Sequence, residues 1–163
     1  MPVDERTFRQ AVGQFVTGVT VIAIDVDGSV RAMTANSFAS LSLDPPLVLF
    51  CLGKQTKAGQ LIRQVDGFSV NILRHDQQDL SSYFAGVWRE LAPPPFSFTS
   101  WEGGPRLDGC TAALGCAVHD IYDGGDHWIV VGKVVATHRS AEGRPPLVFF
   151  GGRYVTLAEE ETS

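Results

Sequence analysis

Apolar and β-branched residues alternate with polar ones over most of the chain, and this pattern predicts a structure made mainly of strands. We expect strands at 19–24, 30–40, 47–52, 68–73, 110–122, 127–138 and 146–150. Asp27-Gly28 predicts a hairpin turn between the first two. Strands at hairpin spacing, with few helices between them, favour a mostly antiparallel barrel.

The helical signals are few and short. Over residues 4–16, apolar side chains recur at helical spacing at Phe8, Val12, Phe15 and Val16, with Asp4 as the expected cap. Thr56 is expected to cap a second helix over 57–63, and a third helix is predicted over 76–85. The prolines at 93–95 place a loop after it.

Length and charge narrow the class of protein. A chain of 163 residues with 44% hydrophobic and 19% charged residues suggests one globular domain. The net charge of −5 and the lack of a basic stripe argue against nucleic-acid binding. The longest apolar run, residues 47–52, is far shorter than the roughly 20 residues of a membrane helix, and no signal peptide precedes it. We therefore expect a soluble, cytoplasmic protein that does not bind a membrane.

Several common catalytic motifs are missing. The chain has no Gly-x-Gly, no phosphate-binding P-loop, no Gly-x-Ser-x-Gly and no His-Glu-x-x-His. Its four histidines are scattered and predict no metal site. The three cysteines do not form a disulfide or zinc pattern, and Cys110 and Cys116 are expected to be small core residues on one strand face.

The segment Thr34–Ser40 has an unusual composition, with hydroxyl and methyl side chains around one of the two asparagines of the chain. Such a stretch is either a strand edge whose side chains satisfy one another or a lining that binds a flat, polar ligand. Three other pieces favour the second interpretation: Asp44-Pro45-Pro46, Gly125-Asp126-His127 and Gly152-Arg153-Tyr154.

Five segments in order, TGVTVIAI, MTANSFASLSLDPPLVLFCL, GFSVNIL, GDHWIVVGKV and LVFFGGRY, resemble the short-chain NAD(P)H:flavin reductases that serve two-component flavin-dependent monooxygenases. The resemblance covers about residues 7–155, so we expect a single flavin reductase-like domain over 1–163. The residues at 159–163 themselves predict a short acidic tail. The resemblance also implies a split β-barrel of the FMN-binding type, antiparallel and Greek-key-like. One departure is Gly151, where the family pattern would place a polar residue.

The resemblance further implies a set of site residues. The flavin ring would be contacted by Thr34, Ala35, Asn36 and Ser37, and the ribityl chain or phosphate by Ser40. Cys51, Leu52 and Gly53 would lie along the ring or the ribityl chain, and Gln55, Thr56 and Lys57 would bind the phosphate. Phe84 would wall the adenine or the dimethylbenzene ring, Arg153 and Tyr154 would bind a pyrophosphate and stack on a ring, and His127 would act catalytically near the nicotinamide.

Structural alternatives remain for several of these residues. Thr56 is also explained as an ordinary helix cap, Phe84 as a core residue, and His127 as a strand histidine that hydrogen-bonds to Asp126 or to solvent. Arg153 and Tyr154 could instead close the barrel mouth.

As an activity, the resemblance implies hydride transfer from NADH or NADPH to FMN or FAD, with reduced flavin passed to a separate monooxygenase. The family generally forms homodimers. The sequence does not choose between FMN and FAD or between NADH and NADPH. A non-catalytic flavin carrier or sensor, and a flavoenzyme that reduces another acceptor, remain alternatives.

Overall fold

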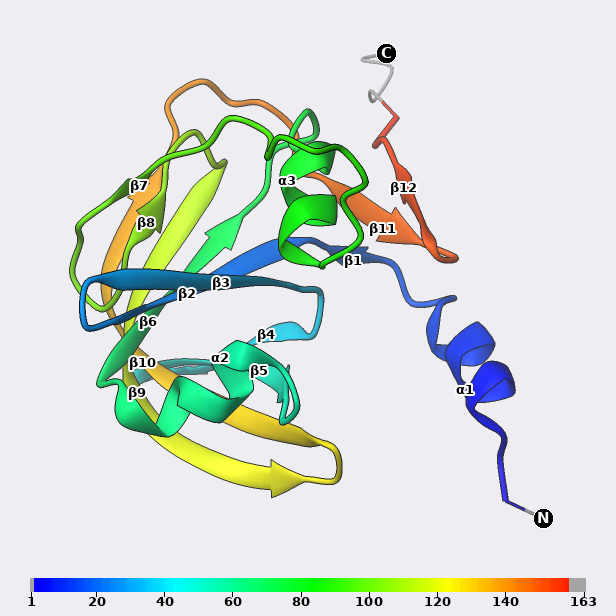
Figure 1. The fold of residues 1–163 in the computed structure, drawn as a ribbon, viewed down its shortest axis with the longest axis horizontal. Coiled ribbons are helices and arrows are strands. Elements are labelled where there is room, and N and C mark those ends of the chain that lie inside the picture. The colour runs from blue at the N-terminus through cyan, green and yellow to red at the C-terminus, as the bar shows by residue number, and fades with distance from the viewer. Residues whose placement is uncertain (1, 159–163) are drawn as a thin grey trace.

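A seven-stranded antiparallel sheet forms the body of the molecule, with the strand order β3-β2-β6-β9-β10-β5-β4 (Figure 1). The computed structural model describes residues 2–158; the predicted acidic tail at 159–163 lies outside them. The strands of this sheet are β2 (Thr20–Val26), β3 (Ser29–Ala35), β4 (Phe38–Leu43), β5 (Pro46–Gly53), β6 (Gly67–Ile72), β9 (Ala112–Gly124) and β10 (His127–Arg139). The antiparallel, mainly β class predicted from the sequence is confirmed.

Two small sheets complete the β structure. One has the order β1-β11-β12 and the other pairs β7 with β8. Their strands are β1 (Thr17–Gly18), β7 (Phe98–Thr99), β8 (Arg106–Leu107), β11 (Val148–Phe150) and β12 (Arg153–Val155).

The predicted single strand over 30–40 is wrong, because the chain breaks at Asn36 and Ser37. The part before the break, β3, pairs with β2, whereas the part after it, β4, pairs with β5. β3 and β4 are therefore the two edge strands of the large sheet although they are consecutive in the chain. The Asn36–Ser37 turn crosses the open seam of the barrel, which we define as the gap between these edges.

The helices are short. α2 (Lys57–Leu61) continues into the 3₁₀ turn η1 (Ile62–Gln64), and α3 (Gln78–Phe84) follows β6. Both α2 and α3 pack against β3 (Figure 1). Among residues 2–158, no helix combines the length and the apolar character needed to cross a bilayer.

The N-terminal helix is shorter than its pattern predicts, and it is exposed. α1 spans Glu5–Val12, and the backbone turns at Gly13 instead of continuing to residue 16. The helix projects from the body of the molecule and buries none of its residues (Figure 1). Its apolar face is therefore exposed to solvent: Phe8 is 60% exposed, and Phe15, just beyond the helix, is 78% exposed.

The core consists of two clusters of buried apolar side chains. In the first, Phe50 and Phe68 meet edge to face with their ring centres 5.0 Å apart. The second joins β2, α3 and β8. Cys116 belongs to the first cluster and Cys110 to the second, so both are core residues as predicted, but they do not share a strand face. Cys110 precedes β9 and is not part of it.

Candidate active site

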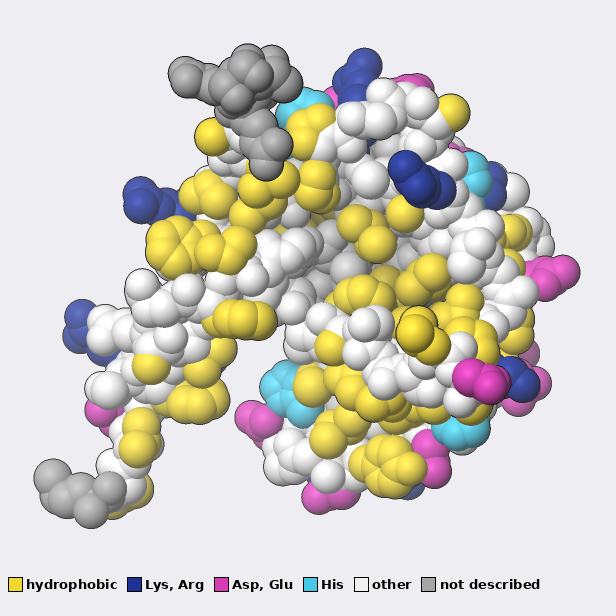
Figure 2. All heavy atoms as spheres, turned by 180° about the vertical axis from the view of Figure 1, so that it is seen from behind, with side chains coloured by type: hydrophobic (Ala, Val, Ile, Leu, Met, Phe, Trp, Pro, Cys, Tyr) yellow, Lys and Arg dark blue, Asp and Glu magenta, His cyan; other side chains and the backbone are white. Residues whose placement is uncertain are grey.

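A cleft opens beside the turn that crosses the seam. This cleft, which we call the seam cleft, has a cavity volume of about 1050 Å³. Figure 2 shows it from behind as the gap between the projecting N-terminal arm, which carries many hydrophobic side chains, and the body. Its walls are mostly apolar, with polar groups from the turn; it is lined among others by Phe8, Val12, Phe15, Asn36, Ser37, Cys51 and Phe149.

Ser37 fixes the turn to the neighbouring strand. Its hydroxyl donates a hydrogen bond to the carbonyl oxygen of Cys51 at 3.0 Å and accepts one from the Cys51 N–H at 3.1 Å. A hydroxyl has two acceptor lone pairs, so one remains for a ligand. Asn36, next to it, is exposed and faces the same cleft. The turn therefore presents an amide and a hydroxyl at one edge of an apolar cavity.

A second cleft of about 610 Å³, which we call the helix cleft, lies between β3, the start of α2 and the end of α3. The predicted residues Thr56, Lys57 and Phe84 line it. The sequence-predicted site is thus divided: Asn36, Ser37 and Cys51 line the seam cleft instead.

The loop that leads into α2 is held at both ends. As predicted, Thr56 caps the helix: its Oγ1 accepts from the N–H of Gly59 at 3.0 Å and donates to the carbonyl of Gly53 at 2.7 Å. A Cβ on Gly59 would lie 1.9 Å from the Gly53 carbonyl oxygen, so only glycine allows this approach. Trp128 donates from Nε1 to the Gly59 carbonyl at 3.1 Å and thereby anchors α2 to β10.

His127 begins β10 directly opposite Gly53. Its Nδ1 lies 2.7 Å from Oδ1 of Asp126, and this hydrogen bond lowers the pKa of the Asp126 carboxyl below its usual range. The other ring nitrogen, Nε2, points toward Gly53 and would lie 3.8 Å from a Cβ there. The side chain is 49% exposed, so the imidazole is oriented by one carboxylate and otherwise accessible.

The structure gives several other predicted residues structural contacts. Thr34 donates to the Ser81 carbonyl at 2.6 Å, and the Tyr154 hydroxyl lies 2.7 Å from the Ser81 hydroxyl, so both tie their strands to α3. The side chain of Leu52 is fully buried in the core and leaves only its backbone for a ligand. Those of Ser40, Gln55 and Arg153 are exposed outside both clefts, and Ala35 is buried.

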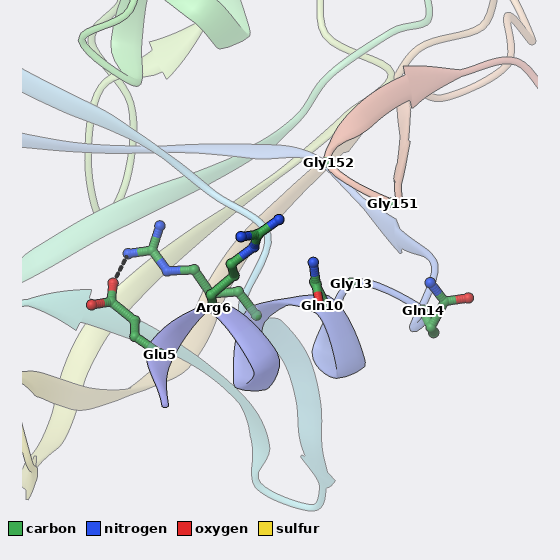
Figure 3. A pocket seen from close by; sticks show the side chains of 8 residues that line it. Glu5, Arg6, Gln10, Gly13, Gln14, Gly151 and Gly152 are labelled. Carbon is green, nitrogen blue, oxygen red and sulfur yellow. Dashed lines mark ion pairs between the residues drawn. The ribbon is translucent and has the colours of Figure 1, made fainter. Parts of the chain in front are cut away.

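A further hollow, between α1 and the turn from β11 to β12, contains none of the predicted site residues (Figure 3). On the α1 side of this hollow, Arg9 forms an ion pair with Glu5 at 2.6 Å, and both side chains are 76% exposed. The two residues lie one turn apart on the same helix, and we assign this ion pair no part in the site.

The comparisons with known proteins agree with this architecture. The model of the flavin reductase like domain matches residues 12–158. The chain belongs to the flavin reductase family. The reductase subunit HsaB of a flavin-dependent monooxygenase from Mycobacterium tuberculosis is 38% identical over 99% of this chain and 87% of its own length. An NADH-dependent FAD reductase from Streptomyces globisporus is 37% identical over 98% of this chain and 89% of its own.

Among solved structures, the flavin reductase PheA2 superposes with a TM-score of 0.90 at 39% identity, covering 96% of this chain and all of that one. The predictions of the family, of the split-barrel fold and of an oxidoreductase are confirmed.

One departure of this flavin reductase from the family pattern has a local explanation. Gly151 and Gly152 have φ angles of +60° and +79° and form the tight turn between β11 and β12. The Gly151 N–H donates to the Gly13 carbonyl at 3.0 Å, which holds the end of α1. A polar side chain at position 151 would adopt this backbone only with strain.

Some residues around the clefts were not predicted from the sequence. The apolar face of α1 lines the seam cleft, whereas its spacing predicted only that the segment is helical. Arg31, on β3, lines the helix cleft. A single arginine in a strand belongs to no sequence motif. Only the structure, which places Arg31 beside α2 and α3, identifies it as a residue of the cleft.

Proposed function

We propose that the protein is an NAD(P)H-dependent flavin reductase that binds the flavin ring in the seam cleft and supplies reduced flavin to a separate monooxygenase. The observation that carries this proposal is the Asn36–Ser37 turn, which places an amide and a hydroxyl at the edge of a large apolar cleft. The names of the relatives, one a monooxygenase reductase subunit and one an NADH-dependent FAD reductase, support it.

The residues of the seam cleft fit a flavin. The isoalloxazine ring has two apolar faces and one polar edge, and ligand cavities of this kind are apolar with a few placed polar groups. The turn offers the Asn36 amide, the free lone pair of Ser37 Oγ and backbone groups to the polar edge. Cys51, Phe8 and Phe149 line the same cleft and suit the two apolar faces of the isoalloxazine ring.

A bound flavin supplies a ring nitrogen, N5, that accepts a hydride from C4 of a reduced nicotinamide. This transfer needs no nucleophile from the protein, so the chain contributes by positioning: two stacked rings must approach to about 3–3.5 Å. The apolar side chains of the seam cleft exclude water from the stack. A reaction that needs no protein nucleophile agrees with the absence of hydrolase motifs from the sequence.

We assign His127 to the nicotinamide, where it orients the carboxamide or delivers a proton to the reduced product. Its imidazole is oriented by Asp126 on one side, and Nε2 is accessible beside Gly53 on the other. Gln55, Thr56 and Lys57 follow Gly53 in the chain, and we assign them to a flavin phosphate, with Lys57 as the cation. Arg153 is assigned to a pyrophosphate.

We further propose a homodimer, in which a second copy covers the exposed apolar face of α1 and closes the seam cleft. Four large apolar residues of α1 and of the segment just after it are at least half exposed: Phe8, Val12, Phe15 and Val16. A contiguous apolar surface of this kind typically marks an interface. The three free cysteines agree with a reducing, cytoplasmic location.

The direct test is the loss of NADH absorbance when the purified protein is mixed with NADH and either FMN or FAD. The proposal predicts turnover that depends on the added flavin. A yellow protein that never consumes NADH would identify a flavin carrier instead. Turnover that ignores free flavin but needs another acceptor, such as a ferric chelate, would identify a different flavoenzyme.

A further inference from the structure

We propose that a pocket outside the seam cleft and the helix cleft binds a small oxyanion of the phosphate type between three arginines. This pocket, which we call the arginine pocket, lies between the end of β10 and the segment that follows β6, and its cavity volume is about 450 Å³. Three arginines, two hydroxyl residues and two small loop residues line it. None of them is assigned to the flavin or the nicotinamide, so the proposal stands apart from the hydride transfer.

The first observation is the concentration of positive charge in an acidic protein. The chain has a net charge of −5 and only 13 lysines and arginines. Three of these, Arg74, Arg139 and Arg144, line the arginine pocket, and none of its lining residues is an aspartate or a glutamate. The three arginines come from separate parts of the chain, so the fold and not a local run of charge brings them together. Like charges repel, and a bound anion would relieve this repulsion.

The second observation is that two of the guanidinium groups are already oriented. Asp76 pairs with Arg74 Nε at 2.5 Å and with Arg144 Nη1 at 3.3 Å. Glu142 pairs with Arg74 Nη1 at 3.6 Å and with Arg144 Nε at 3.4 Å. Among residues 2–158, these ion pairs use only Nε and Nη1 of each arginine, so each Nη2 keeps its two N–H donors for another acceptor. The two carboxylates therefore fix both side chains and leave part of each fork free.

The third observation is an arginine without a carboxylate. In the described part of the chain, Arg139 is exposed and forms no ion pair. Three guanidinium groups thus face two carboxylates, and one positive charge is left over. Beside it, the Ser140 hydroxyl accepts from the Glu142 N–H at 3.3 Å, which leaves its own proton to donate.

The free groups of the pocket are thus nearly all donors, and they carry a surplus positive charge. A phosphate is the anion that a guanidinium fork matches in two parallel hydrogen bonds. The volume of about 450 Å³ lies within the range of roughly 300–1,000 Å³ that small-molecule sites occupy. The pocket therefore has room for a phosphate and for a small organic group attached to it.

The backbone around the arginine pocket is held in place from both sides. Arg74 forms an antiparallel bridge with Pro146, and the His75 N–H donates to the Pro145 carbonyl at 2.9 Å. At the other end of the loop, the Ser140 N–H donates to the Thr111 carbonyl at 2.9 Å. A site formed before its ligand arrives binds more tightly, because less of the protein has to be ordered on binding. Pro146 also lines the seam cleft, so an anion in the arginine pocket would restrain a segment that forms part of that wall.

Thermal melts with increasing inorganic phosphate, without flavin or NADH and with sodium chloride at matched ionic strength as the reference, test the proposal. We expect a saturable rise of the melting temperature of about 3–5 °C at about 10 mM phosphate, as a Kd on the order of 1 mM predicts. A rise that chloride reproduces, or one that does not saturate, would overturn the proposal, because it would reflect screening of surface charge.

Arg139→Ala is the decisive variant, because Arg139 has no ion pair within the described residues whose loss would destabilise the fold. It should melt like wild type without phosphate and need about ten times more phosphate for the same shift. Arg139→Lys should recover part of this loss. The matched control is Arg89→Ala, which removes an exposed arginine that lines none of the clefts described above and should respond like wild type. Equal phosphate responses in Arg139→Ala and Arg89→Ala would overturn the assignment.

Three further ligands define the class of anion. Sulfate should act like phosphate, since it has the same shape, and succinate should act at higher concentrations only. Glycerol phosphate that binds more tightly than phosphate would identify a phosphate ester as the ligand, and equal binding would identify the free oxyanion. Succinate binding more tightly than phosphate would overturn the class.

Steady-state kinetics separate this site from the proposed reaction. KM for NADH and for the flavin should change less than twofold in Arg139→Ala. A tenfold rise in KM for NADH would overturn the proposal of a separate site, because the arginine pocket would then hold part of the coenzyme. If the wild-type protein consumed no NADH, the proposed function would fail, while the melts with phosphate would still decide the arginine pocket.

Discussion

The hydroxyl of Ser37 bonds to both backbone groups of Cys51, donating to its carbonyl and accepting from its N–H. This pair of bonds joins the start of β4 to β5 at the point where the chain crosses the seam. Ser37→Ala removes both bonds and leaves two partly buried backbone groups unpaired, which should cost about 1–2 kcal/mol of folding stability.

Because the same bonds hold the turn beside the seam cleft, we also expect Ser37→Ala to raise KM for the flavin. Ser29→Ala, at an exposed position of β3, is the matched control. Thermal melts and steady-state kinetics measure the two effects. An unchanged melting temperature together with an unchanged KM would contradict the role given to this hydroxyl.

His127→Ala should lower kcat for NADH oxidation by at least about tenfold, as loss of a group that positions or protonates a reactant does. Flavin affinity, measured by fluorescence quenching, should change less than twofold, because His127 is assigned to the nicotinamide and not to the flavin. His119→Ala removes another exposed histidine, on β9, as the control. Equal turnover in His127→Ala and wild type would remove His127 from the mechanism.

The three cysteines should differ in reactivity. Burial raises the pKa of Cys110 and Cys116 to about 12, so at pH 8 both remain thiols, whereas the reactive species is the thiolate. Cys51 is only half buried and lines the seam cleft. Ellman's reagent should therefore titrate one thiol in the native protein and three in guanidinium chloride.

The single native reaction should slow when FMN is added and disappear in Cys51→Ser. A native count of three, or a Cys51 reaction that saturating FMN does not slow, would show that this thiol does not share the seam cleft with a flavin.

The exposed apolar face of α1 predicts a change in oligomeric state. Phe15→Glu places a charge on this face, and burying an unpaired charge in an interface is costly. Light scattering should give a dimer for wild type and a monomer for Phe15→Glu. Val3→Glu, which adds the same charge at a 73% exposed residue outside the seam cleft, should remain a dimer. A monomeric wild type would contradict the proposed pairing.

The sequence predicts best the features that depend on local pattern. The long hairpin of β9 and β10 and the Thr56 cap are where alternation and capping chemistry place them. The break at Asn36–Ser37 was not predicted, since hydroxyl and methyl side chains suit a strand edge and a turn alike. What breaks the strand is the pairing of its two halves with β2 and β5, which are far apart in the sheet.

Residue type alone does not separate site from scaffold. Asn71 is fully buried and bonds through its side chain to Val21, Ser69 and Leu107, so it supports the core, whereas Asn36 is exposed at the seam. The helical spacing of α1 correctly predicts a helix but not that its apolar face stays exposed beside the seam cleft. Long-range packing decides each of these points.

The central claim is that the seam cleft holds the isoalloxazine ring, and a crystal structure of the protein with FMN tests it most directly. We predict ring density in the seam cleft, with its polar edge at Asn36 and Ser37 and its phosphate toward Thr56 and Lys57. FMN bound elsewhere, with these side chains in contact only with protein, would contradict the account.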